Sequence, residues 1–310
     1  MTVALVTGGT GFIGSHLVRR LLRREVSVHV LCRRGSDRWR LSDLGTQVIW
    51  HSERLRDRLS LRRLAARVRP DYVFHLAAAT MHGGRSAPAK EIMTTTLLGT
   101  VNLIEACEAV PYRCFVITGD GFEYGPSRRA PRESDPCRPT TVDGIAKLAA
   151  SLYALHVARQ RQGPITIVRP CSVYGARDDP RRLISRLVDA ALDRRPVALS
   201  HPRVARDFLY VDDIVELYLA LIRRPARVIG EIFNAGSGRQ TALGELVRLI
   251  TRLSGTPCDA RWGTYAVAAH DTEPRRADVS KARAILGWRP RTSLQRGLAH
   301  TIAAARGRRA

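Results

Sequence analysis

The chain has 310 residues, of which 45% are hydrophobic, and carries a formal net charge of +23. This length supports one large domain or two modest ones with buried cores. No apolar run approaches the roughly 20 residues that cross a bilayer. The first strand-like run begins at residue 3, which leaves no room for a cleavable secretion signal. We therefore expect a cytoplasmic protein without a membrane partner.

The distribution of charge argues against a nucleic-acid-binding protein, and the cysteine pattern argues against a disulfide framework or a metal site. Only three of the 51 basic residues are lysines, and the arginines are spread through all regions. Nucleic-acid-binding proteins usually gather basic residues on one face, so we expect no nucleic-acid partner and instead an anionic small substrate, which guanidinium groups suit. The six cysteines form no C-x-x-C pair and the nine histidines show no ligand spacing. Reduced thiols and no metal site are expected.

Short apolar runs alternate with helix-patterned segments along the first 170 residues. Crossover helices between consecutive strands predict a parallel sheet, and hence an α/β fold with a doubly wound Rossmann sheet. The predicted helices lie near 13–24, 58–68, 90–109 and 142–161. The predicted strands are Val3–Val6, Val26–Cys32, Gln47–Trp50, Tyr72–Leu76, Arg113–Thr118 and Ile165–Arg169.

A glycine-rich turn joins the first strand to the first helix. Gly8 permits a sharp exit from the strand, Gly11 lets the backbone approach a pyrophosphate, and Gly14 lets the helix pack closely. The unpaired N–H groups that begin the helix, around Phe12 and Ile13, suit the same anion. The pattern predicts a dinucleotide cofactor.

The residues after the second strand bear on which cofactor binds. A carboxylate that accepts hydrogen bonds from the adenosine ribose is usual at the end of this strand. Cys32 stands there instead, followed by Arg33 and Arg34. Guanidinium groups pair well with a ribose 2′-phosphate, so NADP(H) is favoured, with NAD(H) as the alternative.

Beyond residue 175 the alternation loosens. Loops are expected at Asp178–Pro180 and Ser200–Arg206, a strand at Glu231–Asn234, and helices near 181–194, 212–223 and 242–253. We interpret residues 1–174, with a return segment at about 205–236, as a dinucleotide-binding domain. Residues 175–204 and 237–310 then form a second, smaller C-terminal substrate-binding lobe.

Further motifs recur along the chain beside the glycine turn. They are His75-Leu76-Ala77-Ala78, Tyr124-Gly125, Asp143-x-x-x-Lys147, Val168-Arg169-Pro170, Val173-Tyr174-Gly175, the run 206–213 and Leu286-Gly287-Trp288-Arg289-Pro290. With these motifs, the chain resembles the extended short-chain dehydrogenase/reductases, the NAD(P)-dependent epimerase/dehydratase family, from end to end. It is similar within that family to enzymes that modify nucleotide-diphosphate sugars.

The resemblance implies a nucleotide-diphosphate-sugar substrate and a homodimer formed through the helices near 90–109 and 142–161. It also implies two sets of site residues. The cofactor would be met by Leu55, Leu76, Ala77, Ala78, Lys147 and Pro170. The substrate would be met by Thr80, His82, Tyr174, Arg182, Arg206 and Arg276.

The sequence departs from the family where the proton chemistry is expected. Members of the family carry Tyr-x-x-x-Lys on one helix; here Lys147 is present and Asp143 replaces the tyrosine. Asp120 occupies the position of the usual serine or threonine, four residues before Tyr124, and Thr118 lies close enough along the chain to serve instead. The adjacent Asp-Glu pair of the 4,6-dehydratases is missing.

Three interpretations of Asp143 remain open. It could be a general acid or base whose pKa is raised by burial and by Asp120. It could be a structural ion-pair partner of Lys147, because i, i+4 pairs form readily. The fold could also have lost its redox chemistry. The leading functional hypothesis is an NADPH-dependent reductase of a nucleotide-linked 4-keto-deoxysugar. The alternatives are a redox-neutral epimerase or dehydratase of the same family and a repurposed binding protein.

Overall fold

The computed structural model describes residues 1–79, 87–127, 129–265 and 276–309. The chain divides into two compact units, each made of several segments. Unit 1 comprises Met1–Glu123, Thr141–Arg169 and Val215–Phe233, and unit 2 comprises Tyr124–Thr140, Pro170–Ile214 and Asn234–Ala310. Each unit is described by itself below.

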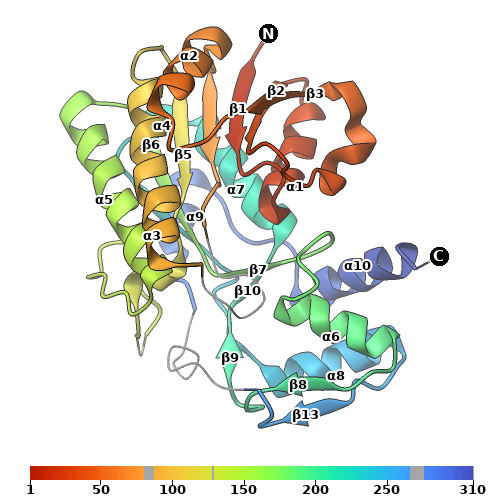
Figure 1. The fold of residues 1–310 in the computed structure, drawn as a ribbon. Helices are drawn as coiled ribbons and strands as arrows, with labels where there is room; N and C mark the ends of the chain where they lie inside the picture. Colours follow the sequence, from red (N-terminus) through yellow and green to blue (C-terminus); the bar gives the residue numbers. More distant parts are fainter. Residues whose placement is uncertain (80–86, 128, 266–275, 310) are drawn as a thin grey trace. The chain divides into compact units, whose positions relative to one another are not determined.

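A parallel sheet forms the centre of unit 1 (Figure 1). Within the described residues it has seven strands in the order β11-β6-β5-β4-β1-β2-β3. The chain winds outward from β1 in one direction and then returns to build the other half from β4, so the strand order switches between β1 and β4. Ligands of such sheets bind at the carboxyl ends of the strands beside this switch. The strands are β1 Val3–Thr7, β2 Ser27–Cys32, β3 Val48–Ser52, β4 Tyr72–His75, β5 Cys114–Thr118, β6 Ile165–Pro170 and β11 Ile232–Ala235.

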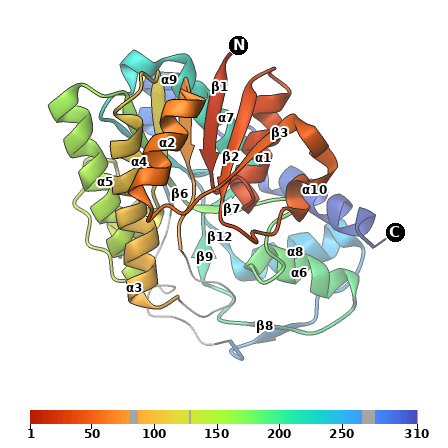
Figure 2. The same cartoon turned by 45° about the horizontal axis from the view of Figure 1, so that its top comes forward.

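Helices cover both faces of this sheet (Figure 2). On one face, α2 (Arg58–Val68), α4 (Gly99–Cys107) and α5 (Val142–Arg161) share a buried core with strand residues such as Val73. The neighbouring Phe74 points the other way, as strand geometry requires, and its ring meets Tyr218 of α7 at 6.3 Å. Helices α1 (Phe12–Leu22) and α7 (Val211–Arg223) cover this second face.

The predicted doubly wound parallel sheet is confirmed, and the element ends differ from the expected ones by only a few residues. One local feature was not expected. The helix near 90–109 consists of α3 (Ala89–Ile92), a π-helical segment η2 (Met93–Leu98) and α4. Single π-helical turns occur often at functional sites. Short 3₁₀ segments lie at η1 Trp39–Gln47, η3 Gly121–Tyr124 and η4 Pro225–Arg227.

Unit 2 is built on three helices that pack on one another: α6 (Leu183–Leu192), α8 (Leu243–Ser254) and α10 (Leu294–Gly307). Pairs of short strands accompany them. Strand β7 (Ser172–Tyr174) pairs with β10 (Phe208–Tyr210), β8 (Val197–Leu199) with β13 (Ala260–Trp262), and β9 (Ala205–Arg206) with β12 (Thr241–Ala242). Helix α9 covers Ser280–Leu286. In the part of the chain that the structure describes, no helix combines the length and apolarity needed to cross a membrane.

Candidate active site

The glycine turn folds so tightly that side chains cannot be added to it. Gly8 has a φ of +71°, and a Cβ there would lie 2.7 Å from the backbone nitrogen of Ala77. A Cβ on Gly14 would lie 2.2 Å from the Gly8 carbonyl oxygen, which itself accepts a hydrogen bond from the Gly11 N–H at 2.9 Å. The backbone of this turn is therefore free of side chains where a ligand would approach.

Helix α1 begins directly after the turn, with Gly11 as its N-cap residue. Among the described residues, no side chain caps this helix start. The N–H groups of its first turn, which lack intrahelical partners, are thus available to an anion and carry the positive end of the helix dipole. This arrangement fits the pyrophosphate of a dinucleotide, as predicted for Phe12 and Ile13.

A buried chain of hydrogen bonds fixes the strand end beside the turn. The Ala77 N–H donates to the Thr7 hydroxyl at 3.3 Å, and this hydroxyl lies 2.6 Å from His75 Nδ1. On the other side of the ring, His75 Nε2 lies 2.9 Å from the Thr100 hydroxyl, which donates to the Thr96 carbonyl. The donors and acceptors match a neutral imidazole protonated at Nε2. Burial lowers the pKa of His75 to about 3, with a smaller effect of the Lys147 charge in the same direction.

Residues of η2 and α4 hold Leu55, another predicted cofactor position, and the loop after β4. The Leu55 carbonyl accepts a hydrogen bond from the Asn102 side chain at 2.9 Å, and a Cβ on Gly99 would lie 2.9 Å from the Leu55 side chain. Thr96, which stands where the family usually has asparagine, bonds the loop after β4 through the Ala79 N–H at 3.2 Å. A shorter polar side chain thus still anchors this loop.

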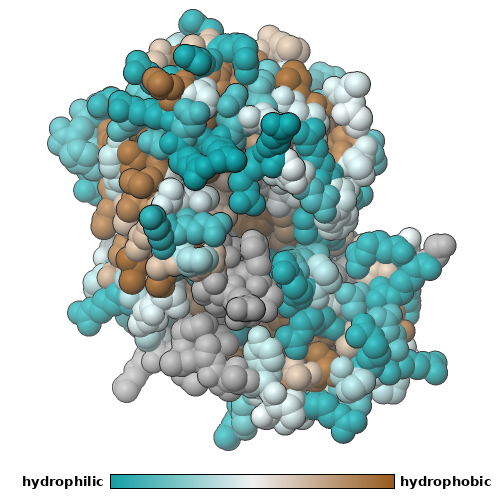
Figure 3. Space-filling model, in the orientation of Figure 1, coloured by the Kyte–Doolittle hydropathy of each residue, from teal (hydrophilic) through white to brown (hydrophobic). Residues whose placement is uncertain are grey.

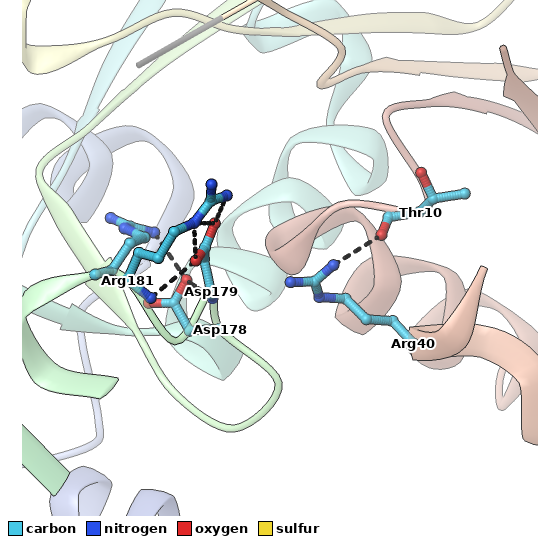
Figure 4. A network of polar contacts seen from close by, with 6 residues as sticks. Thr10, Arg40, Asp178, Asp179 and Arg181 are labelled. Carbon is cyan, nitrogen blue, oxygen red and sulfur yellow. Dashed lines mark hydrogen bonds and ion pairs between the residues drawn. The ribbon is translucent and has the colours of Figure 1, made fainter. Parts of the chain in front are cut away.

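Four arginines lie in the segment after β2, and one of them contacts the glycine turn. Arg33 and Arg34 are exposed just after β2, and two further arginines reach the same region. Arg40 donates to the Thr10 carbonyl of the turn at 3.4 Å (Figure 4), while the Arg38 guanidinium stacks 4.2 Å from the centre of the Trp50 ring. The sequence indicated only Arg33 and Arg34, because Arg38 and Arg40 could not be distinguished from the many other arginines of the chain.

Lys147 is buried on α5, and its Nζ donates to the Thr118 carbonyl oxygen at 2.5 Å. Burial lowers the pKa of Lys147, while the carboxylates of Asp120, Glu123 and Asp143 act in the opposite direction. The lysine thus lies in a carboxylate-rich environment at the end of β5. One of its three donors is committed to backbone.

The structure corrects the role predicted for Thr118. Its hydroxyl is buried and lies 2.9 Å from the Tyr218 hydroxyl in the core. The atom of Thr118 that meets Lys147 is the carbonyl oxygen. This hydroxyl is therefore engaged in the core on the side of α7 and is not placed to donate a proton to a substrate, although β5 ends at Thr118 as expected.

Asp120 and Glu123 organise the segment after β5. An Asp120 carboxylate oxygen accepts the Phe122 N–H at 2.9 Å, which caps η3. Glu123 accepts the Asp120 N–H at 2.8 Å and forms a buried ion pair with Arg169, whose Nε lies 2.8 Å away. A Cβ on Gly119 would lie 2.4 Å from the same Glu123 carboxylate. This pair was not predicted from the sequence, where only the neighbouring Gly119 signals the close approach of a side chain.

Asp143 lies in the first turn of α5, one helical turn before Lys147. The helix is capped by the Thr141 hydroxyl, which accepts the Gly144 N–H at 3.1 Å. A carboxylate in a first helical turn is favoured by the helix dipole. The structure thus brings both predicted carboxylates, Asp120 and Asp143, into the electrostatic environment of Lys147.

Two of the residues predicted to meet substrate in unit 2, Tyr174 and Arg182, have partners within the protein. Tyr174 is a correction: it is buried, its hydroxyl donates to the Leu294 carbonyl, and its ring packs against Tyr210, so it belongs to the core. Arg182 is half-exposed and pairs with the buried Asp178 at 3.2 Å. Burial raises the pKa of Asp178, and the neighbouring Asp179 pairs with Arg181 (Figure 4).

Arg206 and Arg276 stand at the surface of unit 2. Arg206 is half-buried on β9, opposite Thr241, and Arg276 is exposed at the edge of an open hollow of about 650 Å³. Thr80 and His82 lie outside the described residues. In those that are described, no group of three or more His, Cys, Asp or Glu side chains could hold a metal ion.

Comparison with known proteins decides the family. Residues 4–236 match the model of the NAD dependent epimerase/dehydratase family. The chain belongs to this family. A dTDP-glucose 4,6-dehydratase of Neisseria meningitidis is 31% identical over 333 residues, which cover 97% of this chain and 92% of the relative. An uncharacterised UDP-glucose epimerase of Bacillus subtilis, YtcB, is 29% identical over 96% of both chains.

Solved structures agree with this assignment. The UDP-glucose 4-epimerase of Thermotoga maritima, crystallised with UDP-glucose, has a TM-score of 0.92 and 28% identity, with full coverage of both chains. The UDP-glucuronic acid 4-epimerase of Bacillus cereus, in complex with UDP-glucuronic acid and NAD, has a TM-score of 0.88 and 26% identity over 99% of both chains. These relatives catalyse redox-neutral reactions by name, unlike the reductase that the sequence analysis placed first.

Proposed function

We propose that this enzyme epimerises a nucleoside-diphosphate sugar at a ring carbon, without net oxidation, and that a carboxylate replaces the family's tyrosine in proton transfer. The observation that carries the proposal is the buried Lys147, held on the Thr118 carbonyl among Asp120, Glu123 and Asp143. Burying a lysine carries a desolvation cost, and a role in catalysis would account for it. The names of the relatives support the substrate class.

The proton would move between the sugar hydroxyl and Asp143. When bound, the nicotinamide supplies hydride transfer at carbon, and the residues of the chain handle the proton at oxygen. An aspartate ends much closer to the helix backbone than a tyrosine does. A general base can act through one water, so we infer that a water molecule bridges the Asp143 carboxylate and the sugar hydroxyl.

Lys147 and Asp120 would set the electrostatics of this transfer. A positive Lys147 stabilises the ionised form of Asp143, whereas a second nearby carboxylate favours the protonated form. The carboxylates of Asp120 and Asp143 both act on Lys147, so a change at Asp120 is expected to shift the pH profile of catalysis.

The cofactor is proposed to be NADP(H). The support is the arginine group after β2, namely Arg33 and Arg34 together with Arg38 on Trp50 and Arg40 at the glycine turn. The related structures of Bacillus cereus and Thermus thermophilus epimerases contain NAD. A preference for the 2′-phosphate would therefore distinguish this enzyme from those relatives.

The same arginine group favours a second candidate, the NADPH-dependent reductase of a 4-keto sugar nucleotide. Cofactor content separates the two candidates. A redox-neutral enzyme regenerates its cofactor in each cycle, so it needs no external supply. A reductase consumes one NADPH for each product formed.

A homodimer is proposed through the flank formed by η2 and α5, which pack on each other. Large apolar side chains are exposed there, and Figure 3 shows hydrophobic residues gathered on this side of unit 1. They are Leu98, Val142, Ile145 and Leu152, which are 37–57% exposed. Exposed apolar patches of this kind mark protein interfaces.

The proposed function is tested by incubating the purified enzyme separately with UDP-glucose, dTDP-glucose and UDP-glucuronic acid, with and without added NADP⁺ or NAD⁺. NMR of the products is expected to show a C4 epimer of at least one substrate and no net formation of reduced nicotinamide. Turnover only with a 4-keto sugar nucleotide and stoichiometric NADPH would establish the reductase instead.

A further inference from the structure

Asp207 of unit 2 is a buried carboxylate with an unusually complete set of hydrogen bonds. Its side chain is 1% exposed. One oxygen accepts both the Ser237 N–H and the Ser237 hydroxyl, each at 2.6 Å. The other accepts the Gly238 N–H at 3.0 Å and the Ala277 N–H at 3.1 Å. All four donors point at one side chain, which no catalytic role described above uses.

The backbone beside this carboxylate is closely packed. A Cβ added to Gly236 would lie 2.5 Å from an Asp207 carboxylate oxygen and 2.7 Å from the Ala277 side chain. Burial raises the pKa of Asp207, and the hydrogen bonds from Ser237, Ala277 and Gly238 oppose this effect. The site is thus built around one ionised group.

The chain positions of these contacts connect two arginines that are far apart in sequence. Asp207 directly follows Arg206, and the Ala277 N–H that it accepts belongs to the peptide bond with Arg276. Arg206 is fixed on its other side by the pairing of β9 with β12 at Thr241. One carboxylate therefore sets the backbone beside both arginines.

We propose that Asp207 is a positioning residue that holds Arg206 and Arg276 in the arrangement that binds the diphosphate of the sugar nucleotide. The inference rests on the proposed function, because it takes a nucleoside diphosphate as the ligand. Guanidinium groups bind phosphates through two parallel N–H donors. Both donors reach the phosphate only when the backbone that carries the arginine is held in position.

Asp207→Asn tests this with little change in shape. The amide nitrogen of asparagine cannot accept, so either the two Ser237 donors or the Gly238 and Ala277 donors lose their partner. Asp213→Asn is a matched control in the same unit. Asp213 is also buried and accepts two backbone N–H groups, those of Arg291 and Thr292, both at 3.0 Å.

Calorimetry would measure the binding of UDP, UMP, dTDP and dTMP to each folded variant. We expect Asp207→Asn to weaken the binding of the preferred diphosphate roughly tenfold to a hundredfold, since hydrogen bonds to charged groups have this weight. The monophosphate should lose much less, and KM should rise more than kcat falls. Asp213→Asn should lower thermal stability and leave the diphosphate affinity unchanged.

Two further variants keep the inference testable if Asp207→Asn folds poorly. Ser237→Ala removes a single donor and should produce a smaller loss in the same direction. In an Arg206→Ala, Arg276→Ala background, Asp207→Asn should cost little additional affinity, because both arginines that it positions are gone. Equal losses for mono- and diphosphate, a full additional loss in that background, or equal effects of Asp207→Asn and Asp213→Asn would each overturn the inference. Failure of the unaltered enzyme to bind either diphosphate would overturn the proposed substrate class as well.

Discussion

The ion pair between Glu123 and Arg169 gives the sharpest prediction about stability near Lys147. Glu123 is 0% and Arg169 3% exposed, and their atoms are 2.8 Å apart. Replacing Glu123 by Gln removes the charge that faces the guanidinium while keeping the volume. Breaking a buried pair in this way costs about 3–5 kcal/mol of unfolding free energy, because a buried charge loses its compensation.

A matched ion pair in the same unit provides the control. Glu216 pairs with Arg20 at 2.5 Å, but these side chains are 35% and 41% exposed. Because water and salt screen an exposed pair, Glu216→Gln should cost less than about 1 kcal/mol. Both variants replace a glutamate that pairs with an arginine by glutamine, so they differ chiefly in how far the ion pair is buried.

Urea denaturation followed by tryptophan fluorescence, at the same pH and salt, would compare the two variants. The double variant Glu123→Leu with Arg169→Met should recover much of the loss, as replacing a whole buried pair by apolar groups often does. The reasoning would be refuted if Glu123→Gln and Glu216→Gln destabilised the enzyme equally. It would also fail if the double variant were less stable than Glu123→Gln.

Three further predictions concern the cofactor side. Gly14→Ala should abolish detectable binding of the oxidised cofactor in calorimetry, because its Cβ would lie 2.2 Å from the Gly8 carbonyl oxygen; normal binding would show that the turn relaxes. The depressed pKa of His75, about 3, means that the unfolded state binds its proton first as the pH falls. The contribution of His75 to the free energy of unfolding is therefore full above about pH 6.5 and falls toward pH 3 by up to about 1.4 kcal/mol per pH unit. Urea denaturation at a series of pH values should show this slope in the unaltered enzyme and not in His75→Gln. Arg38→Ala, which takes the guanidinium off Trp50, should weaken NADP⁺ at least about tenfold and NAD⁺ much less; equal losses would argue against a 2′-phosphate contact.

Periodicity and turn chemistry were sufficient for the fold of unit 1. Apolar runs that are buried on both faces identify parallel strands, and Gly8 and Gly14 define the turn because the backbone around them leaves no room for a Cβ. The π-helical segment at Met93–Leu98 could not be predicted, since a π-turn leaves the apolar spacing of the surrounding helix nearly unchanged. The paired strands of unit 2 are only two or three residues long, too short to show an alternation of apolar and polar residues.

The site was predictable where spacing carries the information. Asp143 and Lys147 share a helix face because they are four residues apart. Contacts across long sequence separations were not predictable: Arg169 meets Glu123 and Ala277 meets Asp207 only because of the tertiary fold. Tyr174 was misjudged for the same reason, since a motif gives the position of a residue and not the direction of its side chain.

Isotope retention distinguishes a redox-neutral reaction that depends on Asp143 from a net reduction. A nucleotide sugar deuterated at C4 is converted by the unaltered enzyme and by Asp143→Asn and Asp143→Tyr variants, and the product is examined by NMR. We predict an epimer that keeps its C4 deuterium, a loss of rate of about a hundredfold or more in Asp143→Asn, and activity restored in part by the tyrosine. Deuterium lost to added cofactor, or full activity in Asp143→Asn, would contradict the account.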